Sequence, residues 1–288
     1  MEIQKDGGKI IIASEYRTKN IELLTEYERR VRRWLVEDMG VDTELAERIP
    51  FFRDGVVCPE KWFSDGNGFR PLFLLKEVSL GIESLNELDD YFDKWGNKTT
   101  YEFVENPFDD IRIGCFTMWR KIAALAKGLE SVYNGDGIRE YNISEFAYKR
   151  GNEVYTGSIK GYLGKDYKYG ARTDNCAYND TMDRIAVLDI KKIGGGVSAG
   201  SPLSKATLHY SDHIKPFEDL MCQQIELINP TVIICCSHEF SSMKQLAEIR
   251  DATSDHKWIA GHHPTRNSIE NFYMKPLREY EDYCHNKR

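Results

Sequence analysis

Short apolar runs alternate with longer amphipathic segments along most of the chain. Four of these runs, each four to six residues long, predict buried strands, because they are too short for helices and are bounded by Pro, Gly or charged residues. They span residues 72–75, 185–188, 231–236 and 257–260. Strands separated by helices favour a parallel sheet covered on both faces. The predicted fold class is α/β, a three-layer α/β/α arrangement around a central, mostly parallel four-stranded sheet.

Apolar residues at three- and four-residue steps predict the helices between these strands. The predicted helices span residues 20–36, 42–49, 82–95, 116–133, 212–229, 240–250 and 269–283. We interpret residues 1–64 as an N-terminal helical extension and residues 65–288 as the α/β domain. The first two helices could cover the sheet or meet a partner, and we expect the former.

Composition excludes several classes of protein. The chain has 288 residues, of which 41% are hydrophobic, enough for a substantial core. No run approaches the roughly 20 apolar residues that span a bilayer, and the N-terminus lacks the apolar core of a secretory signal, so we expect a cytoplasmic protein without membrane contact. The seven cysteines form no C-x-x-C pair, and Cys235 and Cys236 lie in an apolar run. We therefore expect free thiols, no metal and no cofactor.

The net charge of -7 argues against binding to polyanions through bulk charge. One segment differs, because residues 148–172 carry six Lys or Arg against two acidic residues, with five tyrosines interleaved. Such a segment suits a nucleic-acid backbone and exposed bases, although a solvated loop has the same composition. The glycine-rich residues 194–205 could also approach phosphates closely. The expected contacts with the DNA backbone are Lys160, Lys165, Lys168, Arg172, Ser201 and Lys205.

Three chemically active side chains follow three of the predicted strands. Glu77 follows the first strand, Asp189 ends the second, and His263 follows the fourth. The carboxyl ends of parallel strands lie at one edge of a sheet, so we expect two acids and an imidazole to meet there. Taken singly, such residues more often have a structural role than a catalytic one, as charged residues at the end of a strand or as a histidine in a loop.

Two of these segments resemble motifs of the uracil-DNA glycosylase superfamily. The run KEVSLG at residues 76–81 resembles the first motif, G-[QE]-x-P-G, with Glu77 in the acidic position. His263-Pro264-Thr265 resembles the last motif, H-P-[SA], and the resemblance covers roughly residues 70–285. The chain departs from the family by lacking the first Gly and the Pro of the first motif and the iron–sulfur cysteines of some branches. It also has Asp189 where the family has an Asn.

The resemblance implies cleavage of an N-glycosidic bond after the target nucleotide is flipped out of the duplex. Glu77 would orient or deprotonate water and stabilise the cationic sugar, and His263 would donate a hydrogen bond to the departing base. An Asn amide can donate to O4 of uracil, whereas an ionised Asp189 only accepts, which suits the N4 amino group of cytosine. Excision of ordinary cytosine would destroy the host genome, so the expected substrate is a modified cytosine. Similar prokaryotic members excise glucosylated 5-hydroxymethylcytosine from phage DNA, which makes this the expected base.

Other residues near these positions are expected to contact the substrate. They are Lys76, Ser79, Phe116, Trp119, Lys191, Arg266 and Asn267. Trp119 could stack on a base or belong to the core. The expected partner is double-stranded DNA with a flipped base, bound by a monomer. The alternatives are a uracil or mismatch repair glycosylase, a DNA- or partner-binding protein of the same fold without activity, and an unrelated α/β enzyme that acts on nucleotides.

Overall fold

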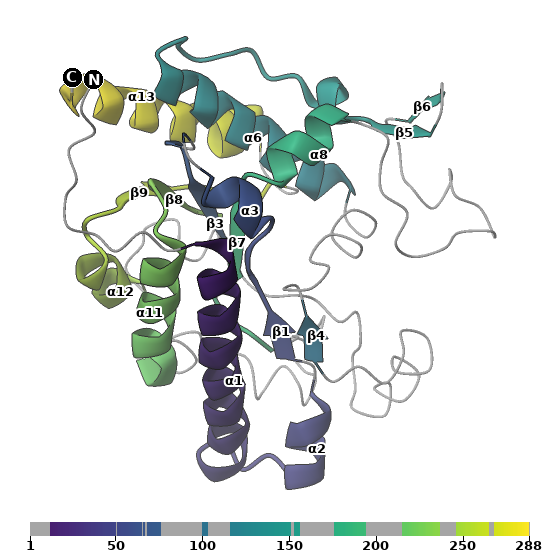
Figure 1. Ribbon diagram of the computed structural model, residues 1–288, viewed down its shortest axis with the longest axis vertical. Coiled ribbons are helices and arrows are strands. Elements are labelled where there is room, and N and C mark those ends of the chain that lie inside the picture. Colours follow the sequence, from purple (N-terminus) through teal and green to yellow (C-terminus); the bar gives the residue numbers. More distant parts are fainter. Residues whose placement is uncertain are drawn as a thin grey trace.

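The computed structural model has an α/β fold built on a mixed five-stranded sheet (Figure 1). The structure describes residues 12–49, 51–64, 66, 68–75, 100–102, 116–150, 153–155, 176–193, 215–236, 246–264 and 268–287. All structural statements below concern these residues.

The strands of the sheet lie in the order β2-β7-β3-β8-β9. Their bounds are β2 Gly55–Val56, β3 Pro71–Leu75, β7 Ala186–Asp189, β8 Val232–Cys235 and β9 Lys257–Ala260. The last four are the predicted strands, and they pair with one another in parallel. The prediction of a four-stranded sheet is corrected by β2, which adds an antiparallel fifth strand beside β7. Two residues are too few to show the alternating pattern that marks a strand in sequence.

Parallel strands with both faces covered consist of almost continuous apolar residues. Every residue of β3, β7 and β8 is buried accordingly. Alternate side chains enter two separate clusters: Phe73 and Leu75 face one layer of helices, and Leu72 and Leu74 face the other. The sheet therefore lies at the centre of the core, as the apolar runs predict.

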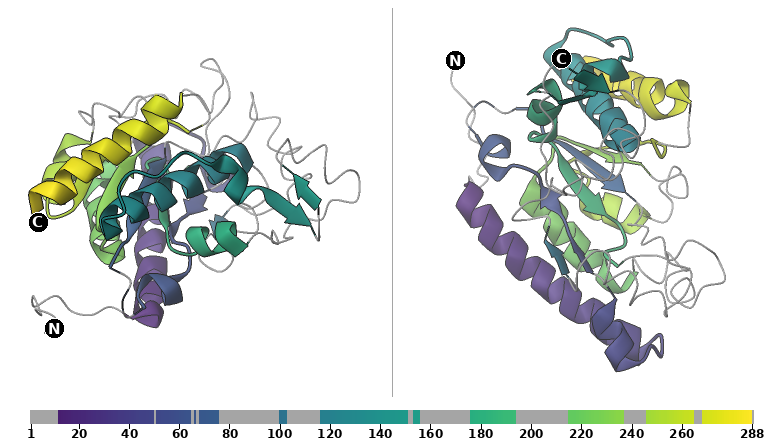
Figure 2. Two further views of the ribbon diagram at one scale, coloured as in Figure 1. Left: turned by 90° about the horizontal axis from the view of Figure 1, so that it is seen from above. Right: turned by 90° about the vertical axis from the view of Figure 1, so that its right-hand side faces the viewer.

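Helices cover both faces of the sheet (Figures 1 and 2). On one face lie α6 (Phe116–Asn134), α8 (Cys176–Met182) and α13 (Lys275–Lys287). On the other face lie α1 (Ala13–Glu37), α3 (Pro59–Trp62), α11 (Glu218–Ile228) and α12 (Ala247–Ala252). None of the helices in the described ranges combines the length and the apolar character needed to cross a membrane.

The N-terminal segment packs directly against the sheet. The Tyr16 hydroxyl accepts the Val56 N–H at 2.8 Å, and the Trp62 indole donates to the Ile228 carbonyl at 2.9 Å. Arg30 of α1 pairs with Asp219 of α11 at 2.7 Å. The first predicted helix thus covers the sheet as expected, whereas residues 43–48 of the second pack in a separate cluster with α1. The N-terminal segment also supplies strands and is not purely helical. Packing does not decide whether either part folds alone, so the boundary at residue 64 stays a prediction.

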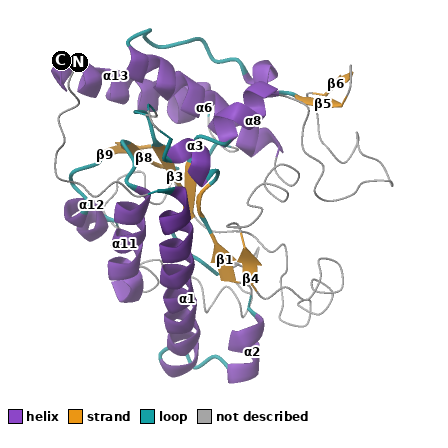
Figure 3. Cartoon of the chain, in the orientation of Figure 1, coloured by secondary structure: helices purple, strands orange, loops and turns teal. Residues whose placement is uncertain are grey.

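Shorter elements complete the described chain (Figure 3). They are α2 (Thr43–Arg48), β1 (Phe51–Arg53), β4 (Thr100–Glu102), the 3-10 helices η1 (Ile143–Phe146) and η3 (Lys215–Phe217), β5 (Tyr148–Arg150), β6 (Glu153–Tyr155) and the π-helix η5 (Glu270–Met274). β1 pairs with β4, and β5 with β6. The helix predicted at residues 82–95 lies outside the described residues.

Candidate functional site

The parallel strands bring two of the three predicted site segments to one edge of the sheet. Asp189, the last residue of β7, pairs with Leu75, the last residue of β3. On the other side, Cys235 of β8 pairs with Ala260 of β9, and the chain continues from there into His263. Glu77 follows β3 directly but lies outside the described residues. The strand before it, β3, nevertheless ends at this edge, between β7 and β8.

The backbone ladder continues just past the strand ends. The N–H of Ile190 donates to the Leu75 carbonyl at 2.8 Å, and that of Gly261 donates to the Cys235 carbonyl at 2.9 Å. Because β3 and β8 separate β7 from β9, a strand spacing of about 4.8 Å puts the Asp189 and Gly261 backbones about 14 Å apart. Asp189 and the segment of His263 therefore follow strands that are not neighbours in the sheet. A ligand that contacts both would lie across the ends of β3 and β8.

The segment carrying His263 is fixed from two sides. A Cβ on Gly261 would lie 3.0 Å from both the Cys235 carbonyl oxygen and Ile234 Cγ2, so glycine allows this close exit beside β8. Beyond it, the Pro264 carbonyl accepts a hydrogen bond from Lys121 Nζ of α6 at 2.7 Å. His263 itself is half-buried. The imidazole is therefore carried by a short segment anchored to β8 and to α6.

Lys121 is a residue that the sequence analysis did not identify. Its Nζ atom also lies 4.8 Å from the centre of the Phe272 ring, a cation–π contact with η5. Partial burial lowers the pKa of the Lys121 ammonium. In sequence, Lys121 looks like one of several charged residues in an amphipathic helix, which is why the apolar pattern did not mark it.

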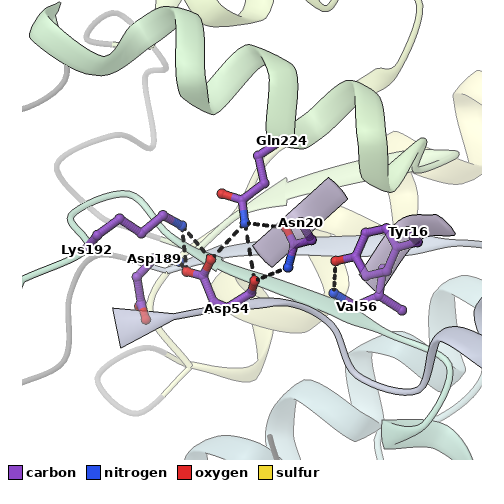
Figure 4. Close-up of polar contacts among 7 residues, drawn as sticks. All are labelled: Tyr16, Asn20, Asp54, Val56, Asp189, Lys192 and Gln224. Atoms are coloured by element: carbon purple, nitrogen blue, oxygen red, sulfur yellow. Dashed lines mark hydrogen bonds and ion pairs between the residues drawn. The ribbon is translucent and has the colours of Figure 1, made fainter. Parts of the chain in front are cut away.

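Asp189 lies where the core meets the edge of the sheet. Its exposed fraction is 4%. Strand alternation places its side chain on the same face as Val187, which packs in the cluster beneath α6. Figure 4 shows the Asp189 side chain directed away from Lys192 and the Asp54 carboxylate. A ligand that contacts this carboxylate would therefore approach from the α6 side of the edge.

The first turns of α6 hold large buried side chains beside this edge. Trp119 is 6% exposed and belongs to the core cluster beneath α6, so stacking on a base would require a rearrangement. Of the two roles considered for Trp119, base stacking and core packing, the structure shows core packing. Arg120, which sequence reasoning did not identify, is 4% exposed, and its burial lowers the pKa of the guanidinium. Phe116 begins the helix, but its side chain lies outside the described residues.

A buried polar network lies on the opposite side of β7 (Figure 4). Lys192 Nζ donates to both carboxylate oxygens of Asp54 at 2.6 Å, and the Asp189 N–H donates to Asp54 Oδ2, also at 2.6 Å. The Gln224 amide donates to Asp54 Oδ1 and to Asn20 Oδ1, each at 3.2 Å. Each of these side chains is nearly inaccessible to solvent. The network joins α1, the start of β2, the end of β7 and α11.

Two effects act on the pKa of the Asp54 carboxyl in opposite directions. Burial raises the pKa of the Asp54 carboxyl, and the Lys192 ammonium, the Asp189 N–H and the Gln224 amide limit that rise.

Sequence reasoning missed the ion pair of Asp54 and Lys192 because its partners lie 138 positions apart. The two adjacent lysines after a buried strand, Lys191 and Lys192, were the available signal. Both are 2% exposed, which is rare for lysine. Lys191 was predicted to contact the substrate, and its burial means that a ligand could reach it only after this segment opened.

A pocket in the described part of the chain lies away from this edge. It has a volume of about 130 Å³ and lies between α6, η1 and α8. Its walls carry both signs of charge, including Lys127, Arg184 and Glu130. No predicted site residue lines it, and we assign it no role.

Several predicted site residues lie outside the described ranges. They are Lys76, Glu77, Ser79, Lys160, Lys165, Lys168, Arg172, Ser201, Lys205, Arg266 and Asn267. Among the described residues, no group of three or more His, Cys, Asp or Glu side chains could hold a metal ion. The absence of a metal and of a cofactor stays a prediction.

Comparisons of the chain with protein-family models, with curated proteins and with solved structures found no match.

Proposed function

We propose that the protein is a DNA glycosylase that excises a modified cytosine-type base, leaving an abasic site. The observation that carries the proposal is the shared edge: Asp189 ends β7, the chain leaves β3 toward Glu77, and β9 leads into His263. All three strands run in the same direction. The resemblance of residues 76–81 and 263–265 to glycosylase motifs gives this edge its chemistry.

Loss of the base leaves positive charge on the sugar and negative charge on the departing ring. Glu77 would orient or deprotonate the attacking water and stabilise the sugar cation. His263 would donate a hydrogen bond to the base oxygen as charge develops there. The anchoring of the His263 segment by Gly261 and Lys121 supports this role, since a donor acts best when it is already in position.

The width of the edge suits a base held between two side chains. About 14 Å separates the backbones beyond β7 and β9, so Asp189 and His263 would contact opposite sides of one extruded ring. Glu77 follows the strand next to β7, so it would lie along the same ring. In this arrangement Asp189 accepts from an exocyclic amino group, as cytosine offers and uracil does not.

The substrate would be 5-hydroxymethylcytosine, above all its glucosylated form, in phage DNA, and the reaction would serve antiviral defence. The basic, tyrosine-rich residues 148–172 and the glycine-rich residues 194–205 would contact the duplex as it is held open. We propose that a monomer in the cytoplasm performs this reaction.

A second candidate is a uracil or mismatch repair glycosylase. The observation that favours it is the burial of Asp189, which is 4% exposed. A buried carboxyl that carries a proton can donate a hydrogen bond, as recognition of O4 of uracil requires.

The test incubates the full chain with duplexes that carry uracil, 5-hydroxymethylcytosine or its glucosylated form, and measures strand breaks after alkali. Breaks only in the modified-cytosine duplexes support the proposal. Breaks with uracil alone favour the second candidate, and no breaks in any duplex contradict the proposal. Glu77→Gln and His263→Asn should each lower the rate by on the order of 100- to 10,000-fold. His256→Asn is the matched control, because His256 lies near Glu226, at 3.6 Å, away from this edge.

A further inference from the structure

The segment that includes the end of β7 and the residues just after it is longer than the segment that pairs with it. Phe51 forms an antiparallel bridge with Ile193, and Gly55 pairs with Val187. Between these two pairings, three residues (52–54) lie opposite five (188–192). The segment after β7 therefore contains a two-residue bulge. Such bulges redirect side chains and are frequent beside active sites.

Asp54 fills the gap that this bulge creates. β2 begins only at Gly55, so no strand carbonyl of β2 lies opposite the Asp189 N–H. The Asp54 carboxylate replaces it and accepts that N–H at 2.6 Å. Lys192, at the other end of the bulge, donates to the same carboxylate, and its own carbonyl accepts the Phe52 N–H at 2.6 Å. The Asp54 carboxylate thus binds both ends of the bulge, and the Phe52 N–H adds a backbone hydrogen bond at the Lys192 end.

Stability alone is a poor explanation for this ion pair. The side chains of Asp54 and Lys192 are 2% and 0% exposed, and removing two charges from water costs about as much as their attraction returns. Apolar side chains of similar volume often replace such pairs without loss of stability. An apolar pair could not accept the Asp189 N–H, however, and this acceptor is what the charged pair adds.

We propose that Asp54, oriented by Lys192, is a positioning residue that fixes the backbone of Asp189 and thereby directs its carboxylate to the α6 side of the edge. This inference rests on the proposed function, in which Asp189 reads the base. Asp54 faces the opposite side of β7 and would act on the base only through Asp189.

Two double variants separate the hydrogen bond to Asp189 from the packing of the pair. Asp54→Leu/Lys192→Met keeps the volume but removes the acceptor. Asp54→Asn/Lys192→Met removes the charges but keeps a side-chain oxygen that can accept the Asp189 N–H. Gln224 can adapt to the Asn amide, since its Oε1 atom is buried and has no hydrogen-bond partner among the described residues. Urea unfolding of both variants establishes that each is folded.

The readout is the rate of base release, with kcat and KM measured separately on the duplex that the wild-type chain cleaves best. The leucine variant should lose on the order of 10- to 100-fold in kcat with little change in KM, because a small misplacement of a positioning group has this cost. The asparagine variant should stay within about three-fold of the wild-type kcat. Equal kcat values for two equally folded variants would overturn the proposal.

Amide hydrogen exchange at Asp189 tests the same inference without turnover. The Asp189 amide should lose protection in the leucine variant and keep it in the asparagine variant. Equal protection in the two variants overturns the positioning role even if a base is released. A wild-type chain that releases no base contradicts the proposed function instead, and the exchange result then still decides whether Asp54 holds Asp189.

Discussion

Lys121 Nζ donates a hydrogen bond to the Pro264 carbonyl oxygen at 2.7 Å, and so joins the second turn of α6 to the segment that carries His263. The same ammonium lies over the Phe272 ring of η5, just before the last helix. One side chain thus connects three segments that meet beside the edge of the sheet. In the proposed reaction it keeps the imidazole at the correct distance from the base.

Replacing Lys121 by Met tests this connection. Methionine keeps the apolar contact with Phe272 but cannot donate to Pro264, so the cost in unfolding free energy should be about 1 to 2 kcal/mol. The rate of base release should fall by roughly 10-fold, because His263 loses its fixed position. Single-turnover kinetics and urea unfolding measure the two effects.

Lys127→Met is the matched control on the same helix. Lys127 pairs with Glu130 at 2.6 Å on the helix surface and contacts neither Pro264 nor Phe272 among the contacts described. Its replacement should leave the rate of base release within about two-fold of the wild-type value. Equal losses of rate in the two variants would show that Lys121 has no special role.

The contact between α1 and α11 predicts a pH dependence of stability. The Arg30 guanidinium holds the pKa of the Asp219 carboxyl below its usual value. Because the pKa is lower in the folded than in the unfolded chain, this stabilisation is present above about pH 4 and is lost as the pH falls through the folded-state pKa. Its size should be below about 1 kcal/mol, since the Asp219 side chain is 55% exposed and screened by solvent.

Urea unfolding of the wild-type chain and of Asp219→Asn at two pH values measures this contribution. The wild-type chain should be the more stable at pH 7, and the difference should shrink as the pH falls through the folded-state pKa of Asp219, because the carboxyl then loses its charge. A difference that persists or grows at the lower pH would show that the Arg30 pair is not its cause.

The thiols should differ strongly in reactivity. Cys176 is exposed, whereas Cys235 and Cys236 are 0% and 1% exposed at the end of β8. Burial raises the pKa of the Cys236 thiol, which further suppresses the reactive thiolate. In the folded protein at pH 8, iodoacetamide should modify Cys176 and leave Cys235 and Cys236 unmodified until urea is added. Peptide mass spectrometry reads the sites, and early modification of Cys236 would mean that β8 is not buried as described.

The sequence predicted the sheet well because its strands are short apolar runs with clear boundaries. Pro71 begins β3, and Asp189 ends β7, so the bounds were visible in the residues themselves. The position of Asp189 and of the His263 segment at one edge followed from the parallel pairing. These features depend on local pattern and on a general rule of topology.

Other features could not be predicted because they depend on distant partners. Asp54 and Lys192 meet only when α1, β2 and β7 are assembled, and the adjacent lysines after a buried strand do not reveal their partner. Trp119 lies on a helix whose apolar spacing was recognised, but the choice between core and ligand contact depends on how α6 is rotated against the sheet. The π-helix Glu270–Met274 shows the same limit, since an apolar pattern over so few residues does not distinguish it from an α-helix.

In the proposed reaction, Asp189 selects a cytosine-type base by accepting a hydrogen bond. The most direct measurement is the ratio of base-release rates from duplexes with glucosylated 5-hydroxymethylcytosine and with uracil, for the wild-type chain and for Asp189→Asn. The wild-type chain should favour the modified cytosine by on the order of 100-fold, and the variant should shift the ratio toward uracil, because its amide can donate to O4. A wild-type chain that releases only uracil, or a ratio that Asp189→Asn leaves unchanged, would show that Asp189 does not select the base in this way.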